Sequence, residues 1–451
     1  MGERRAAPRR SGRLLRRQLV GGLAAGLGAG ALGACQPGQP AQSGGAAPSP
    51  SARERRIEFY VWGNKPEEEV WTQVVQAFQA AYPGAKNEFQ VLGNQFGAKL
   101  STAFAAGTPP DSFYSGGGVP FGSARVEQLM AIDEYMKRDK IDPAEYFPVT
   151  LEVYRHRGKL YSLPIECGAH VVYFNKEVFD RDGETMPDQL VSGGKWTWDQ
   201  LIATARALSM PLSRSPDQFG YAIGRGTQLN AHVWSYGGHF VDKEREPTKS
   251  LWDQPAAQRA LQYWVDLREK HGVRPTQEWM QTYGGTTGVA TAMTTGKLAM
   301  AVQGAWERLF LKDVTFTYDI AILPRGDQPA TEGYASACVG TAASKEPETT
   351  WQWIKFTGGE EGQKIYAGLI SVPPLRRVAE SDWFLKKPPV TNKIYLDAMN
   401  SARSPIGFPE ISRYNEIVSP ILNQVDTAQL GVAEACHQIH TQLSQVLFTG
   451  R

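Results

Sequence analysis

The alternation of strand-like and helix-like segments that begins near residue 56 most constrains the fold. Ile57–Trp62 is an apolar and aromatic run that predicts a β-strand. Pro66 and Glu67–Glu69 favour a helix start, because proline fixes φ and acidic side chains stabilise the positive end of the helix dipole. Apolar residues then recur on one helical face, at Val70, Val74, Ala77, Phe78 and Ala81. The sequence therefore predicts a strand followed by an amphipathic helix that ends at Pro83-Gly84.

The same order continues along the chain. Glu88–Leu92 predicts a second strand, Ala98–Ala106 a helix that Gly107 ends, and Ser112–Ser115 a third strand. Strands separated by helices of this length are typical of a parallel, doubly wound α/β sheet. About 395 residues follow residue 56, which exceeds the usual size of one core, so we expect two α/β domains.

An arginine-rich leader precedes this part. The 16 residues of Leu19–Ala34 carry no charge and fall short of the roughly 20 needed to cross a bilayer, which predicts a signal peptide. Leu32-Gly33-Ala34-Cys35 resembles the lipobox of bacterial lipoproteins. The resemblance implies that residues 1–34 are removed and that lipidated Cys35 holds the protein on the outer face of the cytoplasmic membrane. An amphipathic or disordered N-terminal arm with a chance cysteine is the alternative, and Arg16-Arg17 leaves twin-arginine and general secretory export both open.

Removal of the leader changes the charge balance. The whole chain has 48 basic and 46 acidic residues, and the first 34 residues hold seven arginines and one glutamate. The remainder therefore has 41 basic and 45 acidic residues, a formal charge of −4. No basic stripe is left to predict a nucleic-acid partner. Gln36–Ala52 is uncharged and rich in Pro, Gly, Ser and Ala, which predicts a flexible tether over residues 35–55.

Three cysteines follow the one at position 35. The odd number excludes full internal pairing, although one disulfide stays possible outside the cytoplasm. Thiols packed in apolar cores are favoured by the surroundings of Cys436, which shares a helical face with Val432, Ile439 and Leu443. We therefore expect free thiols at Cys167, Cys338 and Cys436.

Six segments occur in the order found in one protein family. They are Ile57–Gly63, Ala106–Asp111, Leu160–Pro164 with Tyr173–Lys176, Trp196–Asp199, Trp234–Gly238, and Gly296–Met300 with Gly304–Trp306. Together they resemble the carbohydrate-type extracellular solute-binding proteins of bacterial ABC importers, the group that includes maltose-binding proteins. Phe174 stands where tyrosine is common, and Cys167-Gly168-Ala169 is unusual, so the ligand preference stays open.

The resemblance implies a two-lobed α/β fold of the type II periplasmic-binding-protein kind, with a ligand cleft between the lobes and a multi-strand hinge. We expect residues 56–166 and 296–343 in the N-terminal lobe, and 167–295 and 344–451 in the C-terminal lobe. Chain crossings are expected near Ile165–His170, Thr294–Lys297 and Ala342–Glu346. The implied partners are a sugar ligand, the transmembrane subunits of an ABC permease, and the membrane through the lipid. We expect the protein to be a monomer that binds no cofactor.

Sugars offer hydroxyl groups and flat faces of C–H bonds, which aromatic rings and carboxylates can bind. Aromatic residues beside glycine or at segment ends are expected, by the resemblance, to face the cleft: Trp62, Tyr114, Trp234, Trp306 and Tyr334. Core packing is the alternative for single tryptophans, above all at positions 62 and 234. Four further tryptophans lie within helical patterns and are expected in the core: Trp198, Trp264, Trp351 and Trp353.

Three polar residues complete the candidate site. Glu166 follows a short strand at the expected hinge, and its alternative role is a salt bridge that steadies the hinge. Asp111, after Pro109-Pro110, has a stronger alternative, because an aspartate in such a turn binds backbone N–H groups. Asn64 is either a residue at the helix entry or a ligand for hydroxyl groups.

Other interpretations are weaker. Glu434, His437 and His440 are spaced on one helix, where a solvated face is favoured over a metal site. Gly116–Gly118 lacks the Lys-Ser/Thr of a P-loop. A secreted glycosidase would pair Glu166 with Asp111 or Glu332, but the family-like segments leave no room for a catalytic module. A sensory lipoprotein with the same fold is the third alternative.

Overall fold

The computed structural model describes residues 53–448, except for residues 64, 117–124, 210–217, 285–287 and 388–390. The predicted leader, Cys35 and most of the predicted tether lie outside the described residues. Within the part described, no helix combines the length and the apolar character needed to cross a membrane.

The first sheet contains the strands expected near the N-terminus. Its order is β12 (Ala402–Arg403), β11 (Thr331–Gly340), β3 (Ser112–Ser115), β1 (Arg55–Val61) and β2 (Ala85–Val91), and β6 (Pro164–Ala169) also pairs with β11. The predicted parallel pairing is confirmed for β1 with β2 and β3. Alternate residues of β1 point inward and pack on the apolar face of α1 (Lys65–Ala81), which the helical spacing of apolar residues predicted.

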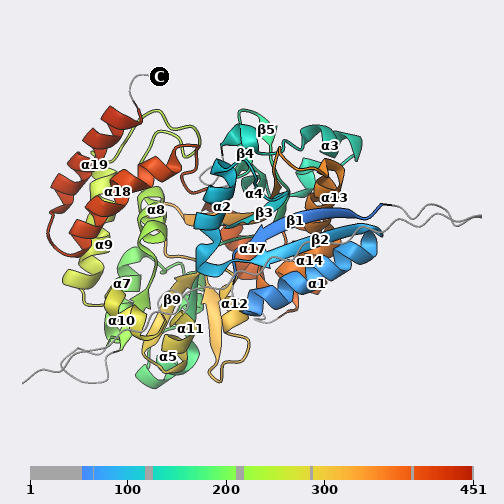
Figure 1. The fold of residues 1–451 in the computed structure, drawn as a ribbon. Helices are drawn as coiled ribbons and strands as arrows, with labels where there is room; N and C mark the ends of the chain where they lie inside the picture. The colour runs from blue at the N-terminus through green and yellow to red at the C-terminus, as the bar shows by residue number, and fades with distance from the viewer. Residues whose placement is uncertain are drawn as a thin grey trace, which may run out of the picture. The chain divides into compact units, whose positions relative to one another are not determined.

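Helices that come late in the sequence also cover this sheet. α13 (Pro347–Thr357) contacts β1 and β11, and α14 (Glu360–Ile370) contacts β6 and α1 (Figure 1). Trp353 of α13 and Trp71 of α1 are both buried, with ring centroids 6.3 Å apart. The segment after residue 344 therefore belongs partly to the first lobe, which corrects the expected boundary.

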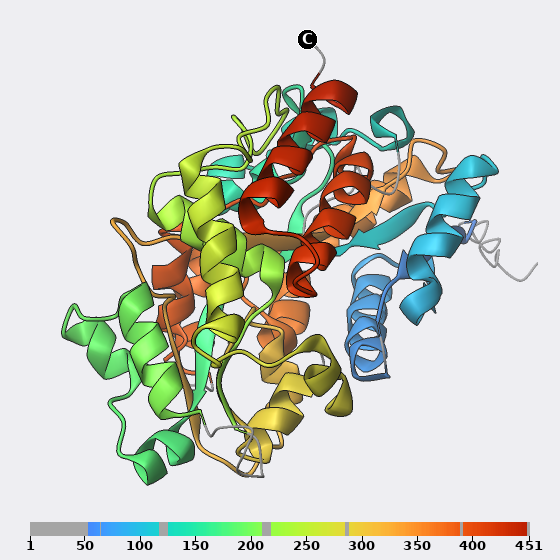
Figure 2. The ribbon, with the colours of Figure 1, turned by 90° about the vertical axis from the view of Figure 1, so that its left-hand side faces the viewer.

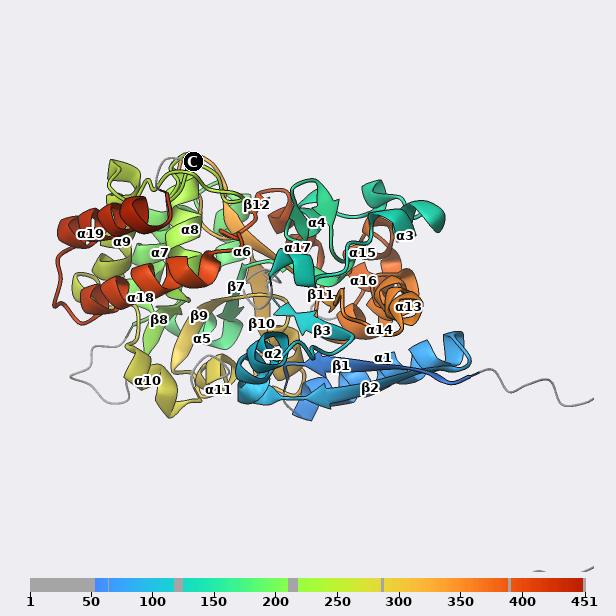
Figure 3. The ribbon, with the colours of Figure 1, turned by 45° about the horizontal axis from the view of Figure 1, so that its top comes forward.

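The second sheet has the order β10 (Tyr318–Ala321), β7 (Val171–Asn175), β9 (Leu298–Gln303) and β8 (Phe219–Ala222). β7 is buried along its whole length, and its residues pack with α7 (Trp198–Ala207). Figure 3 shows these four strands beside the group formed by β1, β2 and β3. Because β9 pairs with β7 and β8, residues 298–303 belong to the second lobe, not to the first as expected.

Two of the family-like segments act as helix caps. Asn175 ends β7, and its Oδ1 accepts hydrogen bonds from the backbone N–H groups of Glu177 and Val178, at 3.0 and 3.3 Å. Thr197 caps α7 through Oγ1, which accepts from Gln200 N at 3.2 Å. Side-chain oxygens at these positions satisfy backbone donors that the first helical turn leaves unpaired.

The chain crosses between the sheets at three places. The first crossing, β6 to β7 through His170, lies where it was predicted. The second runs from β10 to β11 over residues 322–330, and the third follows β12 over residues 404–410, so both differ from the expected positions. Since β6 leaves the first sheet and β11 enters it, the two strands lie side by side in antiparallel order.

The C-terminal helices complete the second lobe. α18 (Ile411–Asp426) packs on α19 (Val432–Val446), and both share a core with α8 (Arg225–Ser235) and α9 (Pro255–Glu269) (Figure 2). Cys436 is buried in this core. Cys167 and Cys338 are also buried free thiols, as expected. The four tryptophans assigned to the core from helical patterns are all buried: Trp198, Trp264, Trp351 and Trp353.

Candidate ligand-binding site

A cavity of about 500 Å³ lies where the two sheets meet at the first crossing. Strands β3, β6 and β11 of the first sheet supply part of its lining. The second lobe contributes β9 and the start of α8, through Gln303 and Thr227. His170, between β6 and β7, also lines it. Residues far apart in sequence therefore converge at the boundary of the two lobes.

An aromatic pair forms one part of the lining. The ring centroids of Trp306 and Tyr334 are 4.7 Å apart at an interplanar angle of 60°, and the His170 ring stands edge-on to Trp306 at 5.5 Å. Two glycines make room for these rings. A Cβ at Gly304 would lie 2.1 Å from the Trp306 ring, and one at Gly168 would lie 2.5 Å from Tyr334 Oη.

The hydroxyl group of Tyr334 fixes this pair in place. Tyr334 Oη accepts a hydrogen bond from Ala305 N at 2.8 Å and lies 3.3 Å from Ser371 Oγ. Burial raises the pKa of Tyr334 well above its usual value, so the hydroxyl stays protonated. Trp62 lines the same cavity directly after β1 and is 44% exposed, which leaves its ring available to a ligand.

Glu166 is the most deeply placed of the predicted ligands. It lies on β6, is 5% exposed, and accepts a hydrogen bond at Oε1 from Tyr114 Oη at 2.6 Å. Tyr366 Oη in turn donates to Tyr114 Oη at 3.2 Å. Oε2 of Glu166 is buried and has no hydrogen-bond partner among the described residues.

Burial raises the pKa of Glu166, and hydrogen bonds from hydroxyl groups lower it in part. No cationic side chain contributes to this balance. The alternative role for Glu166, a salt bridge that steadies the hinge, is therefore not formed within the described part of the chain. A carboxylate with a free buried oxygen is suited to accept a hydrogen bond from a ligand.

Three further glutamates line the cavity: Glu67, Glu307 and Glu332. Glu307 is 1% exposed, has an unpartnered Oε1 among the described residues, and its pKa is raised by burial to about 7. Glu332 Oε2 accepts from Asn230 Nδ2 at 2.8 Å, a bond between β11 and α8. Sequence reasoning did not assign these glutamates or His170 to ligand binding. Glu307 could have been proposed from the sequence, because it directly follows the predicted site residue Trp306.

Two predicted site residues lie outside the cavity lining, and a third lies outside the described residues. Trp234 is 1% exposed in the core shared by α8 and α9, so its alternative role in core packing is the correct one. Asp111 lies outside the cavity lining: Oδ2 accepts from Glu58 N at 2.9 Å, and Oδ1 accepts from Ser344 Oγ at 2.6 Å. It therefore holds the turn instead of a ligand. Asn64 lies outside the described residues.

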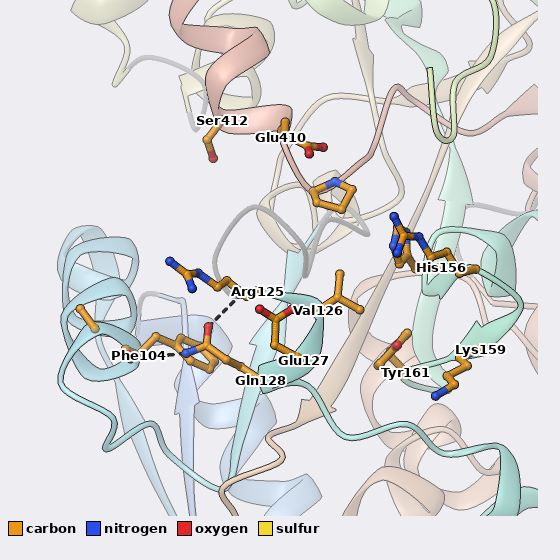
Figure 4. A pocket seen from close by; sticks show the side chains of 13 residues that line it. Phe104, Arg125, Val126, Glu127, Gln128, His156, Lys159, Tyr161, Glu410 and Ser412 are labelled. Carbon is orange, nitrogen blue, oxygen red and sulfur yellow. Dashed lines mark hydrogen bonds between the residues drawn. The ribbon is translucent and has the colours of Figure 1, made fainter. Parts of the chain in front are cut away.

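A wider groove of about 1020 Å³ also separates the two lobes. In Figure 4, Glu410 and Ser412 at the start of α18 face Arg125 and Glu127 of the first lobe. Gln128 is held there by two hydrogen bonds, from Arg125 N at 2.9 Å and to Phe104 O at 3.5 Å. Both carboxylates of the groove are exposed. The smaller cavity, with buried carboxylates beside a fixed aromatic pair, is therefore the better candidate for a specific site.

A protein family and individual relatives match this chain. The model of the family described as bacterial extracellular solute-binding protein matches residues 62–364. A binding protein of Brucella abortus is 24% identical over 378 residues, which cover 80% of this chain and 85% of that protein.

Two solved structures show the same fold. An ABC substrate-binding protein from Listeria monocytogenes, in complex with cycloalternan, has a TM-score of 0.77 at 19% identity and covers 87% of this chain and 99% of its own. Maltose-bound MalE3 of T. maritima has a TM-score of 0.73 at 21% identity, over 87% and 100% of the two chains. The two-lobed type II architecture implied by the sequence is therefore confirmed.

Proposed function

Because the chain belongs to the bacterial extracellular solute-binding protein family, we propose that it captures a carbohydrate in the 500 Å³ cavity and delivers it to the permease of an ABC importer. The observation that carries this proposal is the meeting of the Trp306–Tyr334 pair with the buried carboxylate of Glu166 at a chain crossing. The cycloalternan and maltose named for the two similar structures support carbohydrate as the ligand class.

The lining matches the chemistry of a sugar. The Trp306 and Trp62 rings can cover C–H faces and exclude water, which is favourable by apolar burial. Glu166 Oε2 can accept a hydrogen bond from a hydroxyl group, and a charged acceptor makes the stronger kind of bond. A cavity of this size suits a mono- or oligosaccharide of a few units.

Binding at this place couples to movement of the lobes. Ligand contacts to both β11 and β9 favour the arrangement in which both sheets approach the ligand, and only that difference in affinity shifts the population. The three crossings are the segments about which a hinge motion would occur. We therefore expect the ligand to compact the protein.

Location outside the cytoplasm and lipid anchoring at Cys35 are part of the proposal. The leader and the LGAC motif support them, and the uncharged Gln36–Ala52 segment would let the binding domain reach a permease from the membrane surface. The sensory alternative differs in its partner, which would be a kinase in place of a permease.

Calorimetric titration of the protein with a panel of mono- and oligosaccharides tests the proposal. We expect saturable binding of one or a few sugars, an upward shift of the melting transition with the same sugars, and recovery of the sugar chemically unchanged. Turnover to a new product at many moles per mole of protein would favour the glycosidase alternative. Both Asp111 oxygens already accept hydrogen bonds, which disfavours a catalytic pair of Glu166 and Asp111.

A further inference from the structure

We propose that the ligand of the 500 Å³ cavity carries a protonated amine, so that the preferred substrate is an amino sugar. This inference rests on the proposed function and narrows its substrate class. It is carried by the charge of the lining, by two unpartnered carboxylate oxygens, and by the aromatic faces beside them.

The lining is acidic. Four glutamates reach it from four different elements: Glu67 on α1, Glu166 on β6, Glu307 on α12 (Glu307–Phe310) and Glu332 on β11. No lysine or arginine lines the cavity among the described residues. The described lining therefore holds four carboxyl groups and no lysine or arginine.

Two of these carboxyl groups are more than nine-tenths buried and incompletely bonded. Glu166 is 5% exposed and Glu307 is 1% exposed. Oε2 of Glu166 and Oε1 of Glu307 have no hydrogen-bond partner within the described residues. A buried carboxylate oxygen that lacks both a donor and a counter-ion is costly, so these two atoms are suited to a ligand that supplies both. An ammonium group has three donors, one positive charge and no acceptor.

The nearest arginine in sequence does not serve as the counter-ion. Arg308 Nη1 donates to Ser371 O at 3.1 Å, and its guanidinium lies over the Phe384 ring at 5.7 Å. His170 Nδ1 lies 3.0 Å from the carbonyl oxygen of Glu332. The unpartnered oxygens of Glu166 and Glu307 are therefore left to the ligand.

The aromatic rings add a second attraction for a cation. The faces of Trp and Tyr rings attract an ammonium group through the ring quadrupole, and this attraction grows when water is excluded. Trp306 and Tyr334 line the cavity together with Glu166 and Glu307. A neutral sugar would use the same rings without this attraction for a positive charge.

A metal ion is a poor match for these carboxylates. No group of three or more His, Cys, Asp or Glu side chains in the described part of the chain is placed to hold one. The glutamates are spread over a cavity of about 500 Å³ that is also lined by aromatic rings, which suits an organic cation. An acidic sugar would add a carboxylate to a lining that already holds four carboxyl groups, which is unfavourable.

The test compares matched sugars that differ only at the amine. The full chain is titrated at pH 7 with glucose, glucosamine and N-acetylglucosamine, with the galactose series, and with the corresponding β-1,4-linked oligomers. We expect the amine to bind at least about tenfold more tightly than its neutral and acetylated partners. Equal or tighter binding of a neutral or acetylated partner overturns the inference and leaves carbohydrate capture standing.

Two variants sharpen the comparison. Glu166→Gln and Glu307→Gln each remove a carboxyl group that a bound ammonium would hold in its ionised form, and we expect both to weaken binding of the amine more than binding of its neutral partner. Glu434→Gln, on the exposed face of α19, is the matched control. If the protein binds no member of the glucose series, the galactose series or the β-1,4-linked oligomers, the amine inference is overturned. Carbohydrate capture is then judged separately on the wider sugar panel, where a hit keeps it and no hit removes it too.

Discussion

We expect Trp306 to contribute to sugar binding through apolar contact and stacking of its ring. Its ring is half-buried, lies against Tyr334, lines the cavity and packs partly against the core of the first lobe. We expect Trp306→Ala to weaken sugar binding by about 1–3 kcal/mol through lost apolar burial and stacking. Calorimetry measures the change, and Tyr236→Ala, an exposed ring outside the cavity, is the control. Equal affinity in the wild type and Trp306→Ala would place the sugar elsewhere.

Glu307 makes the stability of the protein depend on pH. Its pKa is raised from 4.5 to about 7 by burial, so between these values the folded chain binds more protons than the unfolded chain. The free energy of unfolding therefore falls as pH rises through this window. Glu307→Gln removes the effect, and the variant should gain on the order of 3 kcal/mol relative to wild type between pH 5 and pH 8.

Urea unfolding at the two pH values measures this difference. Glu434→Gln again serves as the control, because its carboxyl group is exposed. A stability difference between Glu307→Gln and wild type that stays constant with pH would show that the carboxyl group of Glu307 is solvated.

At the scale of elements, β6 shows how strand packing serves the cavity. Gly168 on β6 lies against the Tyr334 hydroxyl, so Gly168→Ala must displace that ring. We expect a loss of about 1–3 kcal/mol in stability together with weaker ligand binding. Gly226→Ala on α8 meets open space and should be neutral or stabilising by up to about 1 kcal/mol. Thermal melts of both variants check this, and similar melts would mean that Tyr334 is free to move.

The local patterns predicted the first lobe well. β1, β2 and β3 and the helices between them lie within a few residues of the predicted ranges, because each has one apolar face and a clear stop such as Pro83-Gly84 or Gly107. β9 was assigned to the wrong lobe. Leu298–Val302 is apolar throughout and buried on both faces. Such a run predicts a strand but does not indicate which sheet the strand joins.

The cavity could be predicted only in part for a similar reason. Trp62, Tyr114, Glu166, Trp306 and Tyr334 all line it, whereas Trp234 and Asp111 do not. A tryptophan beside a glycine pair is equally compatible with a core position, and the sequence gives no three-dimensional distance to separate the two. The charge of the lining was also underestimated, because Glu307 and Glu332 come from segments that only the fold brings together.

At the scale of the whole molecule, the leader and the binding domain have separate roles. We expect Cys35→Ser to release the protein from the membrane fraction and to leave the leader uncleaved, because the thiol is the expected site of lipid attachment. Cys436→Ser is the control, since that thiol is buried in a core of the binding domain. Fractionation and mass spectrometry give the result, and a lipidated Cys35→Ser protein would disprove the assignment.

We expect ligand binding to close the two lobes by a hinge motion. Contacts from both sheets to one ligand should reduce the radius of gyration measured by small-angle scattering, and Trp306→Ala should require more ligand for the same change. An unchanged radius at saturation would show that binding leaves the lobes where they were.

The central claim is that the sugar binds between the sheets at the first crossing. A crystal structure of the protein with the sugar that binds most tightly tests it most directly. We predict density for an intact sugar in the 500 Å³ cavity, with one hydrogen bond to Glu166 Oε2 and a ring face on Trp306. A sugar bound instead in the groove between Arg125 and Glu410, or cleaved in the crystal, would contradict the account.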